Sequence, residues 1–288
     1  MRPSGVLRRG ADFLARHDVD APMRTAEVLL AQVLETDRAG IYTRGEPLRA
    51  PEARAYGRAL CRRCAGVPLQ HITGEQGFRR LTLLVRPGVF VPRPETEIVV
   101  EAALETVRHV VRPDVVDVGT GSGAIALAIK DERPDARVRA IDRSSDAVQL
   151  ARDNADRLGL DVSVELGDLL AGMSDPGDRG GPNPRPDLPR AFDLVVSNPP
   201  YVEPHELEGL PPDVRADPLE ALVGGLEVYE QLFAQAPSHL RPGGAVVVEI
   251  GEAQAGEVTH AAGEAGARSV QVRPDLAGRD RVVVARWA

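Results

Sequence analysis

An apolar run at residues 192–196 ends abruptly in Ser-Asn-Pro-Pro-Tyr. Proline has no backbone N–H to donate to a neighbouring strand, so Pro199 and Pro200 must end any strand that reaches Asn198. The two prolines also make the turn rigid and place an aromatic residue, Tyr201, at its tip. Such a turn is either a simple stop signal or a place that holds a ligand.

A second candidate site is the glycine turn in the stretch Asp-Val-Gly-Thr-Gly-Ser-Gly, which starts at Asp117. A strand is predicted to end at Val118 and a helix to begin near Ser122. Glycines at positions 119, 121 and 123 would let the backbone approach a ligand closely, and the helix N-terminus would offer free N–H groups. The spacing matches neither the dinucleotide-binding nor the phosphate-loop pattern, and glycine turns also occur for steric reasons alone.

Two acids follow neighbouring predicted strands. Asp142 ends the strand after the glycine turn, where an acid can bind both hydroxyls of a ribose, and Asp168 ends the next one. Either acid alone is more often a turn or cap residue. Ligands of parallel sheets bind beyond the carboxyl ends of the strands, so we expect the glycine turn, both acids and Asn198 to converge on one pocket.

The elements that would position these residues alternate between strands and helices. Between them, helices are predicted at 123–132 and 145–159, and this alternation indicates a parallel sheet covered on both faces. Only a short turn separates the last two strands, so they should pair antiparallel. The predicted strands are 115–119, 136–142, 162–166, 192–198, 244–250, 269–275 and 281–287.

The N-terminal part has a different character. Apolar residues recur three and four apart at 11–19, 24–35 and 53–66, which predicts helices, and Asp20 before Pro22 is a candidate helix start. Glycines break the β-branched stretch 71–85, which favours a hairpin. A helix with acids in its first turn should then follow the prolines at 92–107.

Charge is distributed unevenly along the 288 residues, whose formal net charge is −8. Residues 1–93 contain 16 arginines and 9 acids, a net charge of +7, and the remainder is strongly acidic. This favours a negatively charged partner for the first part, although a solvated helical surface is the simpler explanation of the charge alone.

Composition excludes several classes of protein. No apolar run approaches the ~20 residues of a membrane helix, the N-terminus shows no secretory signal, and two cysteines cannot form a disulfide framework. We therefore expect a cytoplasmic protein. Cys61 and Cys64 lack the second pair that a zinc site needs, so no metal is predicted. Aromatic residues, at 3%, form no stripe of the kind that stacks on single-stranded nucleic acid.

Taken in this order, the glycine turn, Asp142 and Asn-Pro-Pro-Tyr resemble the class I S-adenosyl-L-methionine-dependent methyltransferases that methylate a planar nitrogen of adenine, cytosine or glutamine. The resemblance implies an α/β fold, a Rossmann-like domain with a mostly parallel seven-stranded sheet and an antiparallel last strand. It also implies S-adenosyl-L-methionine as cofactor, with S-adenosyl-L-homocysteine as product.

The resemblance implies roles for the residues of the Asn-Pro-Pro-Tyr turn. Asn198, Pro199 and Tyr201 would be catalytic. Asn198 Oδ1 and the Pro199 carbonyl would accept hydrogen bonds from the two N–H groups of the substrate amide, while Tyr201 would stack on the flat face of that amide. Pro200 would complete the substrate site. The cofactor site would comprise Asp117, Gly119, Thr120, Gly121, Ser122, Gly123, Asp142, Asp168 and Asn198.

The sequence outside the turn favours one substrate. Pro-Arg-Pro-Glu-Thr-Glu at 92–97, with the preceding stretch 68–78, resembles the HemK/PrmC family, the glutamine-N5 methyltransferases of peptide chain release factors. The similarity extends to 249–254 and 275–285. By this resemblance Phe90, Arg93 and Thr96 would lie near the cofactor. Glu95 would order the turn, and Glu97 is better explained as a first-turn acid.

The family's substrate is the glutamine of a Gly-Gly-Gln loop in peptide chain release factors. The resemblance divides the chain into a helical substrate-recognition domain at 1–68, a hairpin linker at 69–91 and a methyltransferase domain at 92–288. We expect a monomer with no nucleic-acid substrate and no membrane association. Glutamine methylation of ribosomal protein L3 is the nearer alternative, and adenine-N6 methylation of nucleic acid is the more remote one, which the acidic catalytic domain disfavours.

The sequence departs from the family pattern in three places. A Pro/Gly-rich insertion occupies 174–190, Asp217 replaces the usual glutamate before proline, and the loop after Gly225 is short. The last two flank the expected peptide-binding side, so they bear on how the peptide docks and not on methyl transfer.

Overall fold

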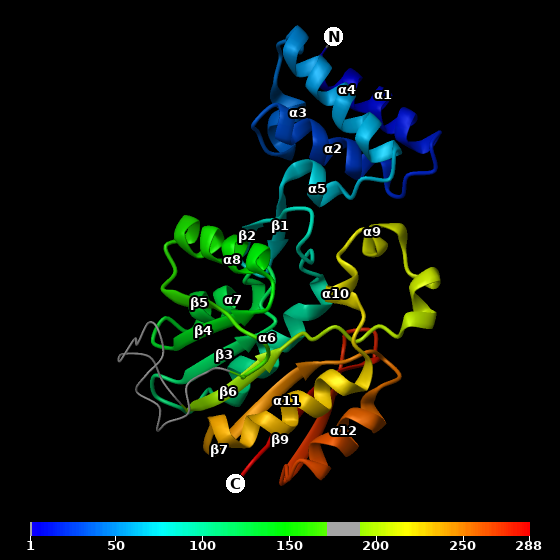
Figure 1. The fold of residues 1–288 in the computed structure, drawn as a ribbon. Coiled ribbons are helices and arrows are strands. Elements are labelled where there is room, and N and C mark those ends of the chain that lie inside the picture. The colour runs from blue at the N-terminus through cyan, green and yellow to red at the C-terminus, as the bar shows by residue number, and fades with distance from the viewer. Residues whose placement is uncertain (1, 172–190) are drawn as a thin grey trace. The chain divides into compact units, whose positions relative to one another are not determined.

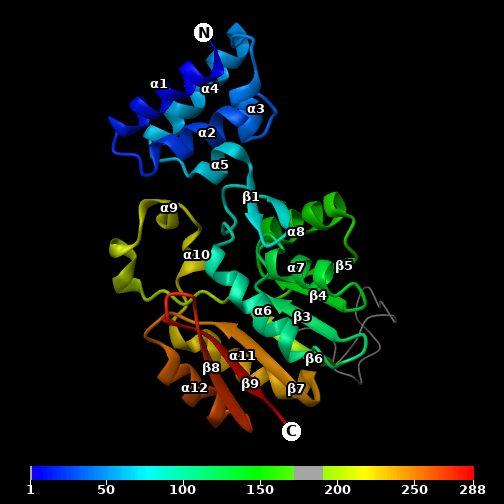
Figure 2. The same cartoon turned by 180° about the vertical axis from the view of Figure 1, so that it is seen from behind.

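The computed structural model describes residues 2–171 and 191–288, and the predicted insertion at 174–190 lies outside them. The chain divides into two compact units (Figures 1 and 2). One comprises Met1–Glu75 together with Pro211–Ala216, and the other Gln76–Leu210 with Asp217–Ala288.

The first unit is helical, as predicted. Proline lies in the first turn of α1, α2 and α4, where its missing N–H costs nothing. Asp20 does not cap α2, contrary to the prediction: Ala21, in the left-handed conformation, precedes Pro22 and makes no side-chain cap. Three short helices, α3, α5 and α9, were not predicted. The helices are α1 (Pro3–Ala15), α2 (Pro22–Val33), α3 (Arg38–Thr43), α4 (Ala50–Cys64), α5 (Leu69–Thr73) and α9 (Pro212–Arg215).

Apolar side chains of α1, α2 and α4 form the core of this unit. Tyr56 of α4 packs so closely on α1 that a Cβ at Gly10 would lie 2.1 Å from its hydroxyl oxygen. The Tyr56 hydroxyl donates a hydrogen bond to the Ala26 carbonyl of α2 at 3.2 Å. In α9, Asp213 accepts two hydrogen bonds from Arg63 of α4, at 3.0 and 3.1 Å, which hold the segment 211–216 in the unit.

The second unit begins with the predicted hairpin, β1 (Glu75–Phe78) and β2 (Leu81–Leu84), and continues into a seven-stranded sheet. The strand order is β5-β4-β3-β6-β7-β9-β8. All pairs are parallel except those of β9, which runs antiparallel to both neighbours. This confirms the predicted α/β fold. The strands are β3 (Asp114–Val118), β4 (Arg137–Asp142), β5 (Val162–Leu166), β6 (Phe192–Ser197), β7 (Leu240–Glu249), β8 (Ser269–Pro274) and β9 (Asp280–Arg286).

Helices cover both faces of this sheet. One core joins the sheet to α6, α7 and α8, and a second joins the opposite face to α11 and α12. The helix after the glycine turn begins at Ala124, two residues later than predicted, because Gly123 is still in the left-handed conformation. The helices are η1 (Pro94–Thr96), α6 (Glu97–Thr106), α7 (Ala124–Glu132), α8 (Ser145–Leu158), η2 (Pro204–Gly209), α10 (Leu219–Leu222), α11 (Gly225–His239) and α12 (Ala255–Glu264).

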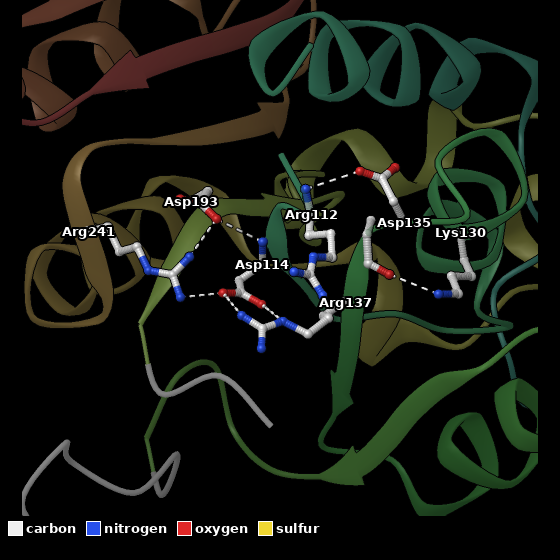
Figure 3. A network of polar contacts seen from close by, with 8 residues as sticks. Arg112, Asp114, Lys130, Asp135, Arg137, Asp193 and Arg241 are labelled. Carbon is white, nitrogen blue, oxygen red and sulfur yellow. Dashed lines mark hydrogen bonds and ion pairs between the residues drawn. The ribbon is translucent and has the colours of Figure 1, made fainter. Parts of the chain in front are cut away.

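A charged network joins the amino ends of the central strands (Figure 3). Asp114, the first residue of β3, is fully buried and pairs with Arg137 of β4 and Arg241 of β7. Arg241 also contacts Asp193 of β6 at 2.6 Å, and Asp193 accepts the Asp114 N–H at 2.8 Å. A buried carboxylate needs such partners, so these residues fix the strand ends opposite those that carry the predicted site.

Two cations share the Asp114 carboxylate, and their removal should be non-additive. We expect Arg137→Ala and Arg241→Ala each to lower the free energy of unfolding by about 1 kcal/mol, and the double variant by about 3 kcal/mol or more, because it leaves a buried charge unpaired. Urea unfolding followed by circular dichroism measures this. Arg80→Ala, which breaks an exposed pair with Asp131, is the control and should cost less than about 1 kcal/mol. Strictly additive costs would contradict the shared-carboxylate explanation.

Candidate active site

Strand register places the predicted site residues together at the carboxyl ends of the parallel strands, which form one edge of the sheet. Val118, the last residue of β3, pairs with Ile141 of β4 and with Ser197 of β6. The Ser197 hydroxyl also donates to the Val118 carbonyl at 2.7 Å. The glycine turn, Asp142 and the Asn-Pro-Pro-Tyr turn therefore emerge side by side from three adjacent strands.

The glycine turn is held against the end of β4. Gly119 and Thr120 donate their N–H groups to the Ile141 carbonyl at 2.8 and 3.0 Å, and Gly121 donates to Asp142 Oδ2 at 2.8 Å. Gly119 and Gly121 have φ of 72° and 56°, and a Cβ on either would meet no atom within 4 Å. These two glycines leave open space where a ligand can approach the backbone.

Gly123 is required by close packing and not by access to a ligand. Its φ is 87°, and a Cβ there would lie 2.9 Å from the Leu127 side chain and 3.3 Å from Ala151. Gly123 therefore allows α7 to pack closely, rather than opening the turn. The carbonyl of Ser122, which is buried, accepts a hydrogen bond from Asn154 of α8 at 2.9 Å.

Asp117 lies buried behind the turn. One carboxylate oxygen, Oδ2, accepts from the Thr120 hydroxyl at 2.6 Å and from the Ala126 N–H at 3.1 Å. The other, Oδ1, is buried without a hydrogen-bond partner among the residues that the structure describes. Burial raises the pKa of Asp117 to about 7, although its two hydrogen bonds oppose the shift. An acceptor left unsatisfied in this way fits a donor group of a bound ligand.

Asp142 and Asp168 lie at the same edge of the sheet. Besides Gly121, Asp142 accepts the N–H of Ser144 at 2.9 Å, and because a carboxylate can accept about four hydrogen bonds, it retains capacity for more. Asp168 is exposed. It was predicted to end its strand, but β5 ends two residues earlier, at Leu166. The adjacent Gly167 donates to the Asp142 carbonyl at 3.0 Å, which places Asp168 next to the end of β4.

The Asn-Pro-Pro-Tyr turn is fixed from two sides. Asn198 Nδ2 donates one of its two N–H groups to Thr96 Oγ1 at 3.0 Å, which holds the amide nitrogen toward Thr96 and leaves Oδ1 as an acceptor for a ligand. On the other side, a Cβ at Gly224 would lie only 2.2 Å from the Pro200 carbonyl oxygen. Backbone thus packs directly on the turn, and Pro199 is buried within it.

Tyr201 is anchored by two polar contacts. Its hydroxyl donates to Glu249 Oε1, at the end of β7, at 3.2 Å, and its carbonyl accepts from Gln254 Nε2 at 2.9 Å. Burial raises the pKa of Tyr201, so the phenol stays protonated and remains a donor. Glu249 is 2% exposed, and burial raises its pKa to about 7.

Phe90 and Arg93 have a different set of neighbours. The Arg93 guanidinium pairs with the buried Asp217 and lies 5.3 Å from the centroid of the Phe90 ring, and Asp217 also accepts the Val91 N–H at 3.2 Å. Asp217, which replaces the glutamate of the family pattern, therefore orders this loop. The place of Phe90 and Arg93 beside a cofactor stays a prediction.

The two glutamates of this segment differ in their surroundings. Glu95 is exposed. Glu97 lies in the first turn of α6, as expected, and its Oε1 also accepts the Arg79 N–H at the hairpin turn at 2.9 Å.

The sequence-based site did not include two residues that shape this edge, Ser197 and Glu249. For Glu249 a signal existed, because an acid follows the apolar run 244–248 just as Asp142 follows its own strand. The pairings of Ser197 and Asp217 depend on segments distant in sequence and carry no such signal.

Within the described residues no group of three or more His, Cys, Asp or Glu side chains could hold a metal ion. Cys61 is exposed and Cys64 is partly buried on α4, and both are free thiols. None of the helices in the described part of the chain is both long and apolar enough to cross a membrane.

Comparison with known proteins identifies the family. Residues 5–74 match the model of the PrmC N-terminal domain, and residues 80–210 match that of the methyltransferase small domain. A release factor glutamine methyltransferase of Deinococcus radiodurans is 41% identical over 100% of this chain and 99% of its own. The chain belongs to the release factor glutamine methyltransferase family.

Other comparisons agree with this assignment. The family member of Moorella thermoacetica is 43% identical over 94% of each chain. Among solved structures, a 16S rRNA N2 methyltransferase of T. Thermophilus, in complex with AdoMet and guanosine, superposes with a TM-score of 0.53. It is 19% identical, covers 74% of this chain and 50% of its own, and shows the shared fold alone. The fold seen here is thus that of the class I methyltransferases.

The raised pKa of Asp117 predicts that the free energy of unfolding depends on pH. Because the ionised carboxyl is disfavoured in the folded state, its contribution to stability is present below the unfolded pKa and is lost as pH rises through about 7. We expect the free energy of unfolding of the wild type, relative to Asp117→Asn, to fall on the order of 2 kcal/mol between pH 5 and pH 8. Urea unfolding without cofactor at each pH measures this.

Asp156→Asn provides the control, since Asp156 is exposed on α8 and its removal should leave the pH dependence of the wild type unchanged. A difference between wild type and Asp117→Asn that stays constant from pH 5 to pH 8 would show that Asp117 does not titrate in this range.

Proposed function

We propose that this protein transfers a methyl group from S-adenosyl-L-methionine to the side-chain N5 of the glutamine in the Gly-Gly-Gln loop of peptide chain release factors. The observation that carries the proposal is the Asn198–Thr96 hydrogen bond, which leaves the Asn198 amide oxygen to accept a substrate N–H at the edge that carries the glycine turn. Relatives about 40% identical over nearly the whole chain are named for this activity.

The glycine turn and its surroundings have the groups that the cofactor needs. Gly119 and Gly121 offer open backbone, and Asp117 Oδ1 is a buried acceptor suited to an ammonium group. Asp142 retains acceptor capacity for ribose hydroxyls. The proposed cofactor site comprises Asp117, Gly119, Thr120, Gly121, Ser122, Gly123, Asp142, Asp168, Asn198, Phe90, Arg93 and Thr96.

S-adenosyl-L-methionine supplies an electrophilic methyl group on a sulfonium when bound. The substrate nitrogen is a poor nucleophile, because its lone pair is delocalised into the amide carbonyl. Asn198 Oδ1 and the Pro199 carbonyl would accept hydrogen bonds from its two N–H groups, and Tyr201 would stack on its flat face, so that these residues would hold and orient the nitrogen for transfer. The two acceptors also stabilise the positive charge that develops on nitrogen.

The transfer balances without a strong base in the protein. A bond forms between nitrogen and the methyl carbon, the carbon–sulfur bond breaks, and S-adenosyl-L-homocysteine is the product. The nitrogen becomes acidic as it is methylated and then loses its proton to solvent. A protein carboxylate with a high proton affinity is therefore not required at the nitrogen.

The N-terminal domain would recognise the release factor. The first part of the chain, which includes this domain, carries a net charge of +7 over residues 1–93, and this suits an acidic protein surface. The domain limits 1–68, 69–91 and 92–288, a monomeric state and a cytoplasmic location belong to the same proposal. Methylation of ribosomal protein L3 is the nearest competitor; the segment 92–97 favours the release factor.

The substrate is tested by mass spectrometry of a release factor incubated with the protein and S-adenosyl-L-methionine. We expect a mass gain of one methyl group on the peptide that contains the Gly-Gly-Gln loop, and no gain on ribosomal protein L3 or on DNA under the same conditions. A gain on L3 or on nucleic acid with none on the loop peptide would overturn the proposed substrate.

Asn198→Ala should separate turnover from cofactor binding. The variant removes an acceptor for the substrate nitrogen, so we expect kcat to fall at least about 100-fold. The dissociation constant for S-adenosyl-L-methionine should change by less than about threefold, because the other residues of the cofactor site remain and Asn198 acts mainly on the substrate. Single-turnover methylation and isothermal titration calorimetry measure the two quantities. Gln149→Ala, on the exposed face of α8, serves as the control. Full activity of Asn198→Ala would disprove the mechanism.

A further inference from the structure

A buried carboxyl group lies directly behind the Asn-Pro-Pro-Tyr turn and has no part in the mechanism above. Glu249 is the last residue of β7, and its exposed fraction is 2%. Its Oε1 accepts the hydrogen bond of the Tyr201 hydroxyl at 3.2 Å, and its Oε2 is buried without a hydrogen-bond partner among the described residues. The Thr96 hydroxyl lies near enough to this carboxyl to favour its ionised form. Thr96 in turn accepts from Asn198 Nδ2 at 3.0 Å. Glu249 thus connects to both ends of the turn.

In this series of contacts, the direction of each hydrogen bond depends on which neighbouring group donates and which accepts. A threonine hydroxyl has a single proton, and an ionised carboxylate has none. With Glu249 ionised, the Tyr201 hydroxyl donates to Oε1, and the unpartnered Oε2 is the acceptor toward which the proton of the Thr96 hydroxyl turns. The Thr96 oxygen then has only lone pairs to offer Asn198, so it accepts from Nδ2. The amide of Asn198 is consequently oriented with Oδ1 toward the substrate side, where an acceptor is required.

We propose that Glu249 is a positioning residue: its carboxylate orients the hydroxyls of Thr96 and Tyr201, and through Thr96 it sets the direction of the Asn198 amide. The proposal rests on the proposed function, because it is the substrate amide that needs an acceptor at Asn198. If Glu249 instead carries a proton, it can donate to Thr96, the Thr96 hydroxyl can turn toward Asn198, and the amide can flip to present a donor against the donor of the substrate.

The surroundings of Glu249 determine the pH at which this exchange occurs. Arg281 of β9, Thr96 and Tyr201 favour the ionised carboxyl, whereas burial and the nearby Glu95 of η1 disfavour it. Tyr229 of α11 donates to the Glu249 backbone carbonyl at 2.8 Å and is kept protonated by burial. The orientation should therefore be complete above the pKa of Glu249, about 7, and should be lost as pH falls below it.

Glu249→Gln in the full-length chain tests the proposal. We expect kcat for methylation of release factor at pH 8 to fall about tenfold or more, while the dissociation constant for S-adenosyl-L-methionine stays within about twofold of wild type. The wild-type kcat should decline below pH 7, and that decline should be absent from the variant. Thermal stability at pH 8 should be equal or higher, because the variant no longer buries a charge.

Two further variants sharpen the test. Glu105 of α6 forms an exposed ion pair with Arg273 of β8. Glu105→Gln makes the same chemical change there and should behave as wild type. Thr96→Val removes the intermediate hydroxyl, and because Glu249 acts through it, the double variant should lose little more activity than the worse single variant.

The outcomes separate the two proposals. If the wild type does not methylate release factor, the proposed function and the role of Glu249 fall together. If the wild type is active and Glu249→Gln retains its kcat and pH profile, only the positioning role is overturned. A variant that fails to fold, or losses that multiply in the double variant, would show that Glu249 acts structurally or independently of Thr96, and would also overturn it.

Discussion

The pairing of Val118 with both Ile141 and Ser197 is the constraint on which the site depends. It brings the ends of β3, β4 and β6 to one level, so that a glycine turn, an acid and the Asn-Pro-Pro-Tyr turn emerge together. Because side chains alternate along a strand, a slip of one residue would reverse the face of every side chain in that strand and destroy both cores. Hydrophobic burial on two faces therefore enforces the register that the site requires.

Buried carboxyl groups have different kinds of partner at the amino ends and at the carboxyl ends of the strands. At the amino ends of the strands, Asp114 is matched by two guanidinium groups. At the carboxyl ends, Asp117 and Glu249 form their side-chain hydrogen bonds with hydroxyl groups, and burial raises the pKa of each to about 7. The first arrangement stabilises the sheet. The second leaves acceptor capacity and a titratable group beside the place where a ligand would bind, which is typical of functional sites.

Much of the fold could be predicted from the sequence. All seven strands of the large sheet were expected near their observed positions. The buried parallel strands appear as apolar runs between helices, and the last two, which pair antiparallel, flank a short turn. The errors concern features that local pattern does not encode. Ala21 rather than Asp20 precedes α2, and α7 begins at Ala124 because Gly123 retains a left-handed backbone. For the site, the predicted convergence of the glycine turn, Asp142 and Asn198 agrees with the strand register, whereas the contacts that orient these residues were not predicted.

The sequence by itself determined which groups end each strand, since those residues follow directly on the apolar runs, and it identified the family through the turns at 92–97 and 198–201. Only the tertiary structure decided which of them touch. Thr96 and Asn198 are 102 residues apart, and Tyr201 and Glu249 are 48 apart. Hydrogen bonds over such separations exist only because strand pairing and core packing bring the segments together, and no local pattern in the chain specifies them.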